Sequence, residues 1–321
     1  MKTIKRVIKI AGHGIHSGEP VTMTLRPSRR PGIFMRRTDL AGTEKIAATF
    51  DNVGATHLRN TTIGNPVGAH VQTVEHLMAA LFMAGIDSVV IDIDGPETPI
   101  LDGSAREFYD AIAAAADGQS APMHQIVVRR PVVATATEIM RTLPKWTRIR
   151  IWVMNKLAGR RSDGYVKLCP GDAGKLTIGA TLVYPEPIIG RQSYTYTYDG
   201  TKKSIATFVR DVARARTFGK YSEWEYLKRH GMGRGANEHN VIALNDAGDG
   251  TLNPVQWPDE FVRHKIIDAI GDMFTSGGFV CGTLESYKGS HALNNLVLKK
   301  LFSDPANYDI IETKTNKGKR K

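Results

Sequence analysis

The residues best suited to chemistry lie in a short run late in the chain, from His264 to Asp272. On a helix, His264, Asp268 and Asp272 are spaced four residues apart and therefore share one face. A histidine and a carboxylate at this spacing can reach a single metal ion. They can equally form an ordinary surface pair, so the spacing alone leaves both interpretations open.

A second candidate is the adjacent pair Glu75 and His76, near the start of a helix expected over 73–84. In metallohydrolases a histidine on a helix binds zinc while a neighbouring glutamate handles protons. No second histidine follows at the zinc-protease spacing, so this helix would supply only one ligand. The alternative is a glutamate that favours the helix N-terminus, beside a structural histidine.

His291 is the third candidate, because it opens a helix directly after Lys288-Gly289-Ser290. A carboxylate such as Asp272 nearby would hold its imidazole protonated, which is the state that a general acid needs. A histidine that only caps or packs against the helix is the competing interpretation.

The elements that must position these residues occur in the same order twice. A helix over 73–84, a strand over 88–94, a loop and a second helix after Ser104 are matched by a helix over 258–274, a strand over 279–287 and a helix from about 291 to 302. This order predicts two similar α+β layers with a boundary near 117–125. If the two halves face each other, His76, His264 and Asp268 could meet as three ligands of a catalytic zinc site with one position open.

Composition restricts the class of protein. The chain has 321 residues, 41% of them hydrophobic, which excludes a mostly disordered chain. No apolar run reaches the roughly 18 residues of a membrane span, and the first ten residues predict an edge strand rather than a signal peptide. Two cysteines, Cys169 and Cys281, argue against a disulfide framework and favour the cytoplasm.

The net charge of +11 is confined to two segments. Seven Lys/Arg and no acids lie in 141–161, and five more lie in 313–321; without these twelve charges the chain would carry −1. Such segments indicate an anionic partner, membrane or nucleic acid, or simply a solvated surface. Because 141–161 also holds Trp146 and Trp152, we expect either a membrane-surface element or an extra hairpin with buried tryptophans.

Several motifs together resemble one known family. They are Thr73–Leu77, Pro99–Ala105, Arg214–Gly219, Glu260–Asp272 and His291–Asn295, with Gly12–Gly18 and Leu25–Pro27 near the start. In type and order they are similar to those of the UDP-3-O-acyl-N-acetylglucosamine deacetylases (LpxC type), the zinc amidases of lipid A biosynthesis. The resemblance extends over about residues 3 to 302.

The resemblance implies an α+β fold of two similar two-layer sandwich domains, packed face to face, with the active site at their interface. The expected domains are 1–122 and 123–303, the second with inserts near 138–164 and 219–247, and 304–321 is expected to be a basic tail. The implied reaction is hydrolysis of the N-acetyl group of a UDP-linked 3-O-acyl-N-acetylglucosamine. Its products are acetate and UDP-3-O-acyl-glucosamine.

The resemblance also implies a role for individual residues. The implied Zn²⁺ ligands are His76, His264 and Asp268. The implied catalytic residues are Glu75 as general base, His291 as general acid, Asp272 to orient that acid, and Thr217 to hold the carbonyl oxygen in the transition state. The implied substrate contacts are Phe218, Lys265, Lys288 and Tyr184, with the lysines on the sugar-nucleotide side and Tyr184 stacked on uracil.

Departures from the family pattern affect the substrate side. Two of them are Gly235–Asn240 with Arg234 in the expected acyl passage, and Val183–Pro187 in place of an acidic-aromatic pair. The other two are Lys288–His291, where the order of Gly and Ser is exchanged, and a longer 138–164 segment. We expect a monomer in the cytoplasm, with peripheral contact to an anionic inner membrane face and no nucleic-acid partner. The alternatives are a zinc amidase for a related acylated amino sugar and a non-catalytic basic membrane- or nucleic-acid-binding protein.

Overall fold

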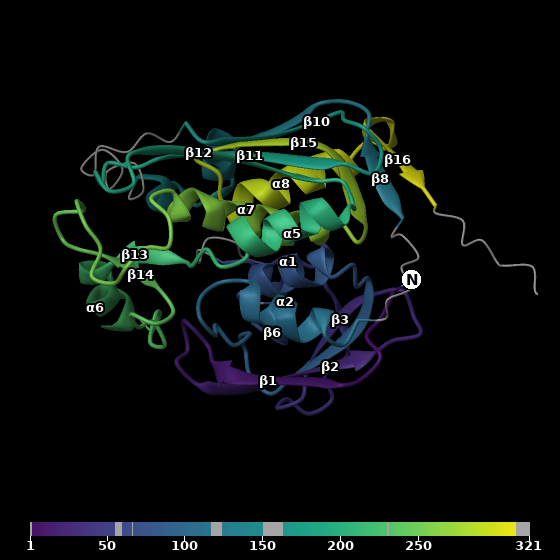
Figure 1. The fold of residues 1–321 in the computed structure, drawn as a ribbon, viewed down its shortest axis with the longest axis horizontal. Helices are drawn as coiled ribbons and strands as arrows, with labels where there is room; N and C mark the ends of the chain where they lie inside the picture. The colour runs from purple at the N-terminus through teal and green to yellow at the C-terminus, as the bar shows by residue number, and fades with distance from the viewer. Residues whose placement is uncertain are drawn as a thin grey trace, which may run out of the picture.

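The protein folds into four layers in the order sheet, helices, helices, sheet (Figure 1). The computed structural model describes residues 2–54, 60–65, 67–116, 124–149, 163–229 and 231–312. The predicted α+β fold of two sandwiches packed through their helices is confirmed. The domain boundary expected near 122 lies outside the described residues.

The N-terminal sandwich has a five-stranded sheet in the order β1-β2-β7-β3-β4. Strands β3 and β7 run parallel, and the other neighbours run antiparallel. A short hairpin of β5 and β6 lies beside it, and two helices cover its inner face (Figure 1). The elements are β1 (Ile8–His13), β2 (Pro20–Pro27), β3 (Gly32–Arg37), β4 (Ile46–Ala47), β5 (Ile63–Gly64), β6 (His70–Val71), α1 (Glu75–Met83), β7 (Ser88–Ile93) and α2 (Arg106–Ala113).

The C-terminal sandwich repeats this plan with a larger sheet, in the order β12-β11-β15-β10-β9, which β8 and β16 extend beside β15. The expected repeat appears as α1-β7-α2 and α7-β15-α8. The elements are β8 (Gln125–Val128), β9 (Val132–Thr135), β10 (Tyr165–Cys169), β11 (Leu176–Val183), β12 (Arg191–Tyr198), α5 (Lys202–Asp211), α7 (Glu260–Phe274), β15 (Phe279–Tyr287), α8 (His291–Phe302), the 3₁₀ turn η1 (Pro305–Asn307) and β16 (Tyr308–Ile311).

Two excursions leave this framework. The first is α3 (Ala136–Thr142), whose start is fixed by a capping box between Thr135 and Glu138; the backbone is helical again over 145–149. The second comprises β13 (Phe218–Lys220), α6 (Tyr221–Arg229) and β14 (Ile242–Leu244), with β13 and β14 paired in parallel. The expected inserts, near 138–164 and 219–247, remain predictions, and 150–162 falls outside the described residues.

The start of the expected basic tail is ordered. Residues 305–311 form η1 and β16, and β16 pairs antiparallel with β8. The sheet therefore continues past the limit of 303 that the sequence predicted. The basic residues from 314 onward lie outside the described part of the chain. None of the helices in the described ranges has the length and apolarity needed to span a bilayer.

Helices α1 and α7 cross at the centre of the molecule. All nine residues of α1 and thirteen of the fifteen in α7 are buried, because each helix is covered by its own sheet on one side and by the other helix on the opposite side. One interpretation of the sequence was that His264 and Asp268 form an ordinary surface pair. Instead, the polar residues of both helices are buried where the two sandwiches meet.

Gly271 allows the backbones of α1 and α7 to pack closely at this crossing. A Cβ atom at this position would lie 1.9 Å from the carbonyl oxygen of Glu75 in α1. That distance is far inside van der Waals contact, so any side chain here would push the two helices apart.

We therefore expect Gly271→Ala to destabilise the protein by about 1–3 kcal/mol in urea unfolding. Helix propensity alone would favour alanine by about 1 kcal/mol, so a loss of stability identifies the contact with α1. Gly68→Ala is the control, because a Cβ there meets only ordinary contacts with Asn65. A Gly271→Ala variant as stable as the parent would contradict this account of the crossing.

Candidate active site

A strained loop leads into α1 and fixes its first residues. Thr73 has a φ of 58°, in the left-handed region that costs a β-branched residue about 1–3 kcal/mol. Its hydroxyl donates to the buried carboxylate of Glu97 (2.7 Å) and accepts from the side-chain amide of Asn60 (3.1 Å). These buried bonds hold the strained turn, and the turn aims Glu75 and His76 at α7.

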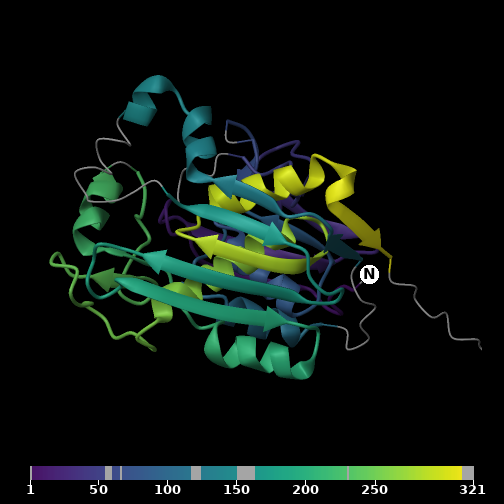
Figure 2. The same ribbon diagram turned by 90° about the horizontal axis from the view of Figure 1, so that it is seen from above.

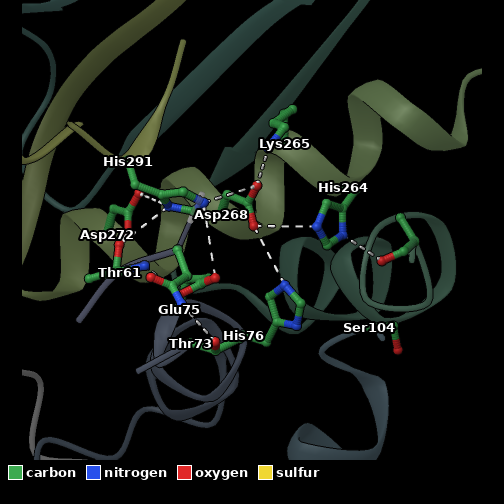
Figure 3. Close-up of polar contacts among 12 residues, drawn as sticks. Thr61, Thr73, Glu75, His76, Ser104, His264, Lys265, Asp268, Asp272 and His291 are labelled. Carbon is green, nitrogen blue, oxygen red and sulfur yellow. Dashed lines mark hydrogen bonds and ion pairs between the residues drawn. The ribbon is translucent and has the colours of Figure 1, made fainter. Parts of the chain in front are cut away.

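His76, His264 and Asp268 come together at the crossing of α1 and α7 (Figure 3). The Nε2 atoms of His76 and His264 lie 3.6 and 3.5 Å from Oδ1 of Asp268. The two imidazole rings stand nearly perpendicular, with their centroids 4.9 Å apart. One potential ligand atom from each residue therefore lies within 4.8 Å of the others, close enough to surround a single ion.

The protonation states of these residues suit a divalent cation. Nδ1 of His264 donates to the carbonyl oxygen of Ala215 (3.0 Å), which leaves the Nε2 lone pair facing Asp268. Burial lowers the pKa of His264 to about 3, so the ring is neutral. Burial alone would raise the pKa of Asp268, but the charge of Lys265, 2.7 Å away, and the nearby histidines hold it well below its usual value.

One atom in this group is left without a hydrogen bond. Oδ1 of Asp268 is buried and has no hydrogen-bond partner among the described residues. A buried ionised oxygen in that position is costly unless a cation or donor meets it. Two imidazoles and one carboxylate are a typical ligand set for Zn²⁺. The donor set and the bare oxygen therefore both fit a metal site.

His291 belongs to a second buried network beside the first. Its Nδ1 donates to Oδ2 of Asp272 (2.8 Å), and Asp272 also accepts from the Thr61 hydroxyl (2.5 Å) and the Asn294 amide (2.8 Å). Burial would lower the pKa of His291, but Asp272, followed by Glu75 and Asp268, raises it to about 9. The imidazole is thus a cation at neutral pH, as the sequence analysis expected of a nearby Asp272.

Glu75 lies between the two networks. Its Oε2 accepts the backbone N–H of Thr61 (3.0 Å), and its Oε1 lies 4.0 Å from Nε2 of His291. Burial raises the pKa of Glu75, although the nearby His291 and His76 oppose that shift. The carboxylate and the imidazolium therefore face each other across a short gap (Figure 3).

A cavity of about 350 Å³ opens onto this gap. Nine of the residues named by the sequence analysis line it: Glu75, His76, Tyr184, Thr217, Phe218, His264, Lys265, Asp268 and His291. Asp272 lies behind His291 and does not line the cavity. Lys288 does not line it either, and its ammonium pairs with Asp163 at 2.6 Å.

One part of the cavity wall is mainly apolar. It comes from the loop after β1 and from the second excursion, which also contributes Lys220 and Glu223, and its apolar residues are Ile15, Trp224, Leu227, Ala236, Val241 and Leu244. An ion pair between the buried Glu186 and the half-buried Lys220 (2.9 Å) also lies on the wall, where the sequence departs from the family pattern. The cavity thus joins a charged end, beside α1 and α7, to an apolar arm.

Sequence reasoning missed Thr61, Asn294 and Glu97. Asn294 lies within a motif already noted and is three residues after His291 on α8, so helix spacing could have identified it. Thr61 and Glu97 carry no comparable signal, because their roles depend on contacts with distant parts of the chain.

Comparison with known proteins shows the family of this chain. The family model described as UDP-3-O-acyl N-acetylglycosamine deacetylase (LpxC) matches residues 1–303. The chain belongs to the LpxC family. It is 37% identical to the UDP-3-O-acyl-N-acetylglucosamine deacetylase of Neisseria meningitidis serogroup C, over 97% of this chain and 92% of that protein. It is 38% identical to the deacetylase of the same name from Myxococcus xanthus, over 97% and 88% of the two chains.

The site predicts how metal content responds to substitution. We expect His264→Ala and Asp268→Ala to lower the metal bound per chain, measured by elemental analysis after dialysis against a slight excess of Zn²⁺. His239→Ala is the matched control, because that histidine is exposed and does not line the cavity. Unchanged metal content in the Asp268→Ala protein would rule out this ligand set.

Proposed function

We propose that this LpxC-family protein is a zinc-dependent deacetylase acting on UDP-3-O-acyl-N-acetylglucosamine. The observation that carries the proposal is the meeting, in one cavity, of a three-residue ligand set with a buried carboxylate and a buried imidazolium. This constellation combines what amide hydrolysis needs: a site for a cation, a base and an acid. The names and near-complete coverage of the relatives support the choice of substrate.

His76, His264 and Asp268 would hold the zinc ion. When bound, zinc polarises the amide carbonyl and acidifies water. Its charge would also favour the ionised form of the neighbouring Glu75 and counter the effect of burial on that carboxyl.

We assign the proton transfers to Glu75 and His291. Glu75 accepts a proton from the attacking water, and Thr217 offers a hydroxyl to the oxygen that becomes negative. His291 donates its Nε2 proton to the departing nitrogen, because an amine leaves as a neutral group far more readily than as an anion. Asp272 keeps Nδ1 engaged and the ring charged until that transfer. The products are acetate and the free amino sugar nucleotide.

The two ends of the cavity suit the two ends of this substrate. Lys265 and Tyr184 at the charged end fit the sugar nucleotide, and Phe218 lies between them and His264. The apolar arm fits the 3-O-acyl chain. Lys288 would reach a phosphate only by leaving Asp163. Cytoplasmic location and a monomeric state remain predictions from the sequence.

Two other functions would use parts of this structure. A zinc amidase for a related acylated amino sugar would use the same site and would differ only in the cavity wall. A non-catalytic binder would have no use for a buried carboxylate facing a buried imidazolium, which is costly to maintain. The site therefore favours a hydrolase over a binder, and the names of the relatives favour UDP-3-O-acyl-N-acetylglucosamine as the substrate.

The first test is catalytic. The purified protein with Zn²⁺ is expected to release one acetate for each UDP-3-O-acyl-N-acetylglucosamine consumed. Glu75→Gln should lower kcat by about 10²–10⁴-fold while metal content is kept, since it removes the base and not a ligand. Glu107→Gln, an exposed acid outside the cavity, serves as the control. A metal-loaded protein that releases no acetate would contradict the proposed function.

The second test is the pH profile of kcat/KM. Activity needs Glu75 ionised and His291 protonated, so the profile should be bell-shaped, with the alkaline limb near the pKa of about 9 that Asp272 imposes on His291. Asp272→Asn removes the negative charge that stabilises the imidazolium, so the alkaline limb should move to lower pH. A limb that does not move would remove His291 from the role of acid.

A further inference from the structure

The first excursion carries an unusual exposed surface. We call residues 136–149 the α3 arm; it contains α3 and the helical residues 145–149. Trp146 is 81% exposed and Ile149 is 43% exposed. Trp146 is the most exposed aromatic side chain in the described part of the chain, and no residue of α3 is buried. The prediction of buried tryptophans is therefore wrong for Trp146, while Trp152 lies outside the described residues.

The α3 arm is also positively charged. Arg141 and Lys145 are exposed, Arg148 is half-buried, and no Asp or Glu occurs between 139 and 149. The nearest acid in the sequence is Glu138. Its carboxylate is engaged elsewhere, because it completes the cap with Thr135 and pairs with Lys300 at 2.5 Å. An exposed indole within a stretch of basic side chains that contains no acid is typical of surfaces that meet an anionic bilayer.

The base of the arm lies next to the catalytic cavity. The arm leaves β9 after Thr135 and the chain returns at Tyr165, and these two residues pair with each other across the sheet. Tyr165 in turn pairs with Tyr287 of β15, and the chain continues from there to Gly289, Ser290 and His291 on the cavity wall. The Ala136 N–H donates to the Gly164 carbonyl (2.8 Å), which fixes the start of the arm.

The position of the arm in the whole molecule agrees with this local geometry. Seen from above, α3 and the helical turn after it project beyond the edge of the C-terminal sheet, toward the same end of the molecule as α6 (Figure 2). Helix α6 carries Trp224 and Leu227 of the apolar arm of the cavity. The α3 arm and the helix that supplies part of the apolar cavity wall therefore lie toward one end of the protein.

We propose that the α3 arm docks the protein onto an anionic phospholipid bilayer. Trp146 and Ile149 enter the interfacial layer, and Arg141, Lys145 and Arg148 contact lipid phosphates. Docking at this end would bring the cavity to a substrate whose acyl chain is held in the membrane. That benefit rests on the proposed function, whereas the docking itself depends only on the exposed surface.

The test is co-sedimentation of the full chain with large vesicles, either of phosphatidylglycerol mixed with phosphatidylcholine or of phosphatidylcholine alone. We expect binding to the anionic vesicles only, and weaker binding at high salt. Each basic residue near anionic lipid contributes about five-fold to partitioning, so Arg141→Ser with Lys145→Ser should weaken binding by about 25-fold. Trp146→Ala should weaken it further and abolish a blue shift in tryptophan emission.

The matched control is Lys202→Ser with Lys203→Ser, two exposed lysines on α5. It removes the same charge from another surface and should change binding by less than about two-fold if the α3 arm is the contact. Equal losses in the two double variants, no binding by the parent, or tighter binding to duplex DNA than to anionic vesicles would each overturn the proposal.

A second measurement separates this proposal from the proposed function. Metal content and deacetylation of a short-chain, water-soluble substrate should be the same in the parent and in the α3-arm variants. If the parent binds anionic vesicles through the arm but releases no acetate, the function fails and the docking stands. If acetate is released normally but vesicle binding is absent, the docking fails alone.

Discussion

The close crossing of α1 and α7 is the contact on which the rest of this protein depends. Each helix carries ionisable side chains into a dehydrated interface, where an isolated charge would be prohibitively costly. The crossing brings the side chains of α1 within reach of partners from the other half of the chain, so that His76 lies 3.6 Å from Asp268 and Glu75 lies 4.0 Å from His291. Gly271 permits the short distance between the helices. Because the helices are close, their polar side chains form a single site.

Two histidines in this site show how neighbours decide the state of a side chain. His264 donates to a backbone carbonyl and is neutral, with a pKa of about 3, because burial dominates. His291 is equally buried but donates to a carboxylate, and its pKa rises to about 9. The same residue type thus serves as a candidate ligand in one place and as a candidate acid only a few ångströms away.

Much of this arrangement could be predicted from the sequence, for reasons that are local. The four-residue spacing of His264, Asp268 and Asp272 fixes a shared helix face, and the repeated order of helix and strand indicates two sandwiches. The motifs that resemble the LpxC family located the remaining site residues, most of which line one cavity.

Other features could not be predicted, because they depend on contacts between distant residues. Thr61 bridges Glu75 and Asp272, which lie in different halves of the chain. Strand β16 forms by pairing with the edge of β8. Residues 305–311 alone do not indicate that this edge is available to them. Both central helices are covered on two sides, which erases the amphipathic pattern that a sequence analysis relies on.

The division of the ligand set between two halves of the chain has a consequence for biogenesis. His76 leaves the ribosome before more than half of the protein has been made, whereas His264 and Asp268 follow near the end. The site therefore cannot exist in a nascent N-terminal sandwich, and a cation held between the helices would bind only the fully docked molecule. By mass action such a cation would stabilise the docked state over a chain whose two sandwiches have folded separately. Metal supply would then influence how much mature protein accumulates, as well as how active each molecule is.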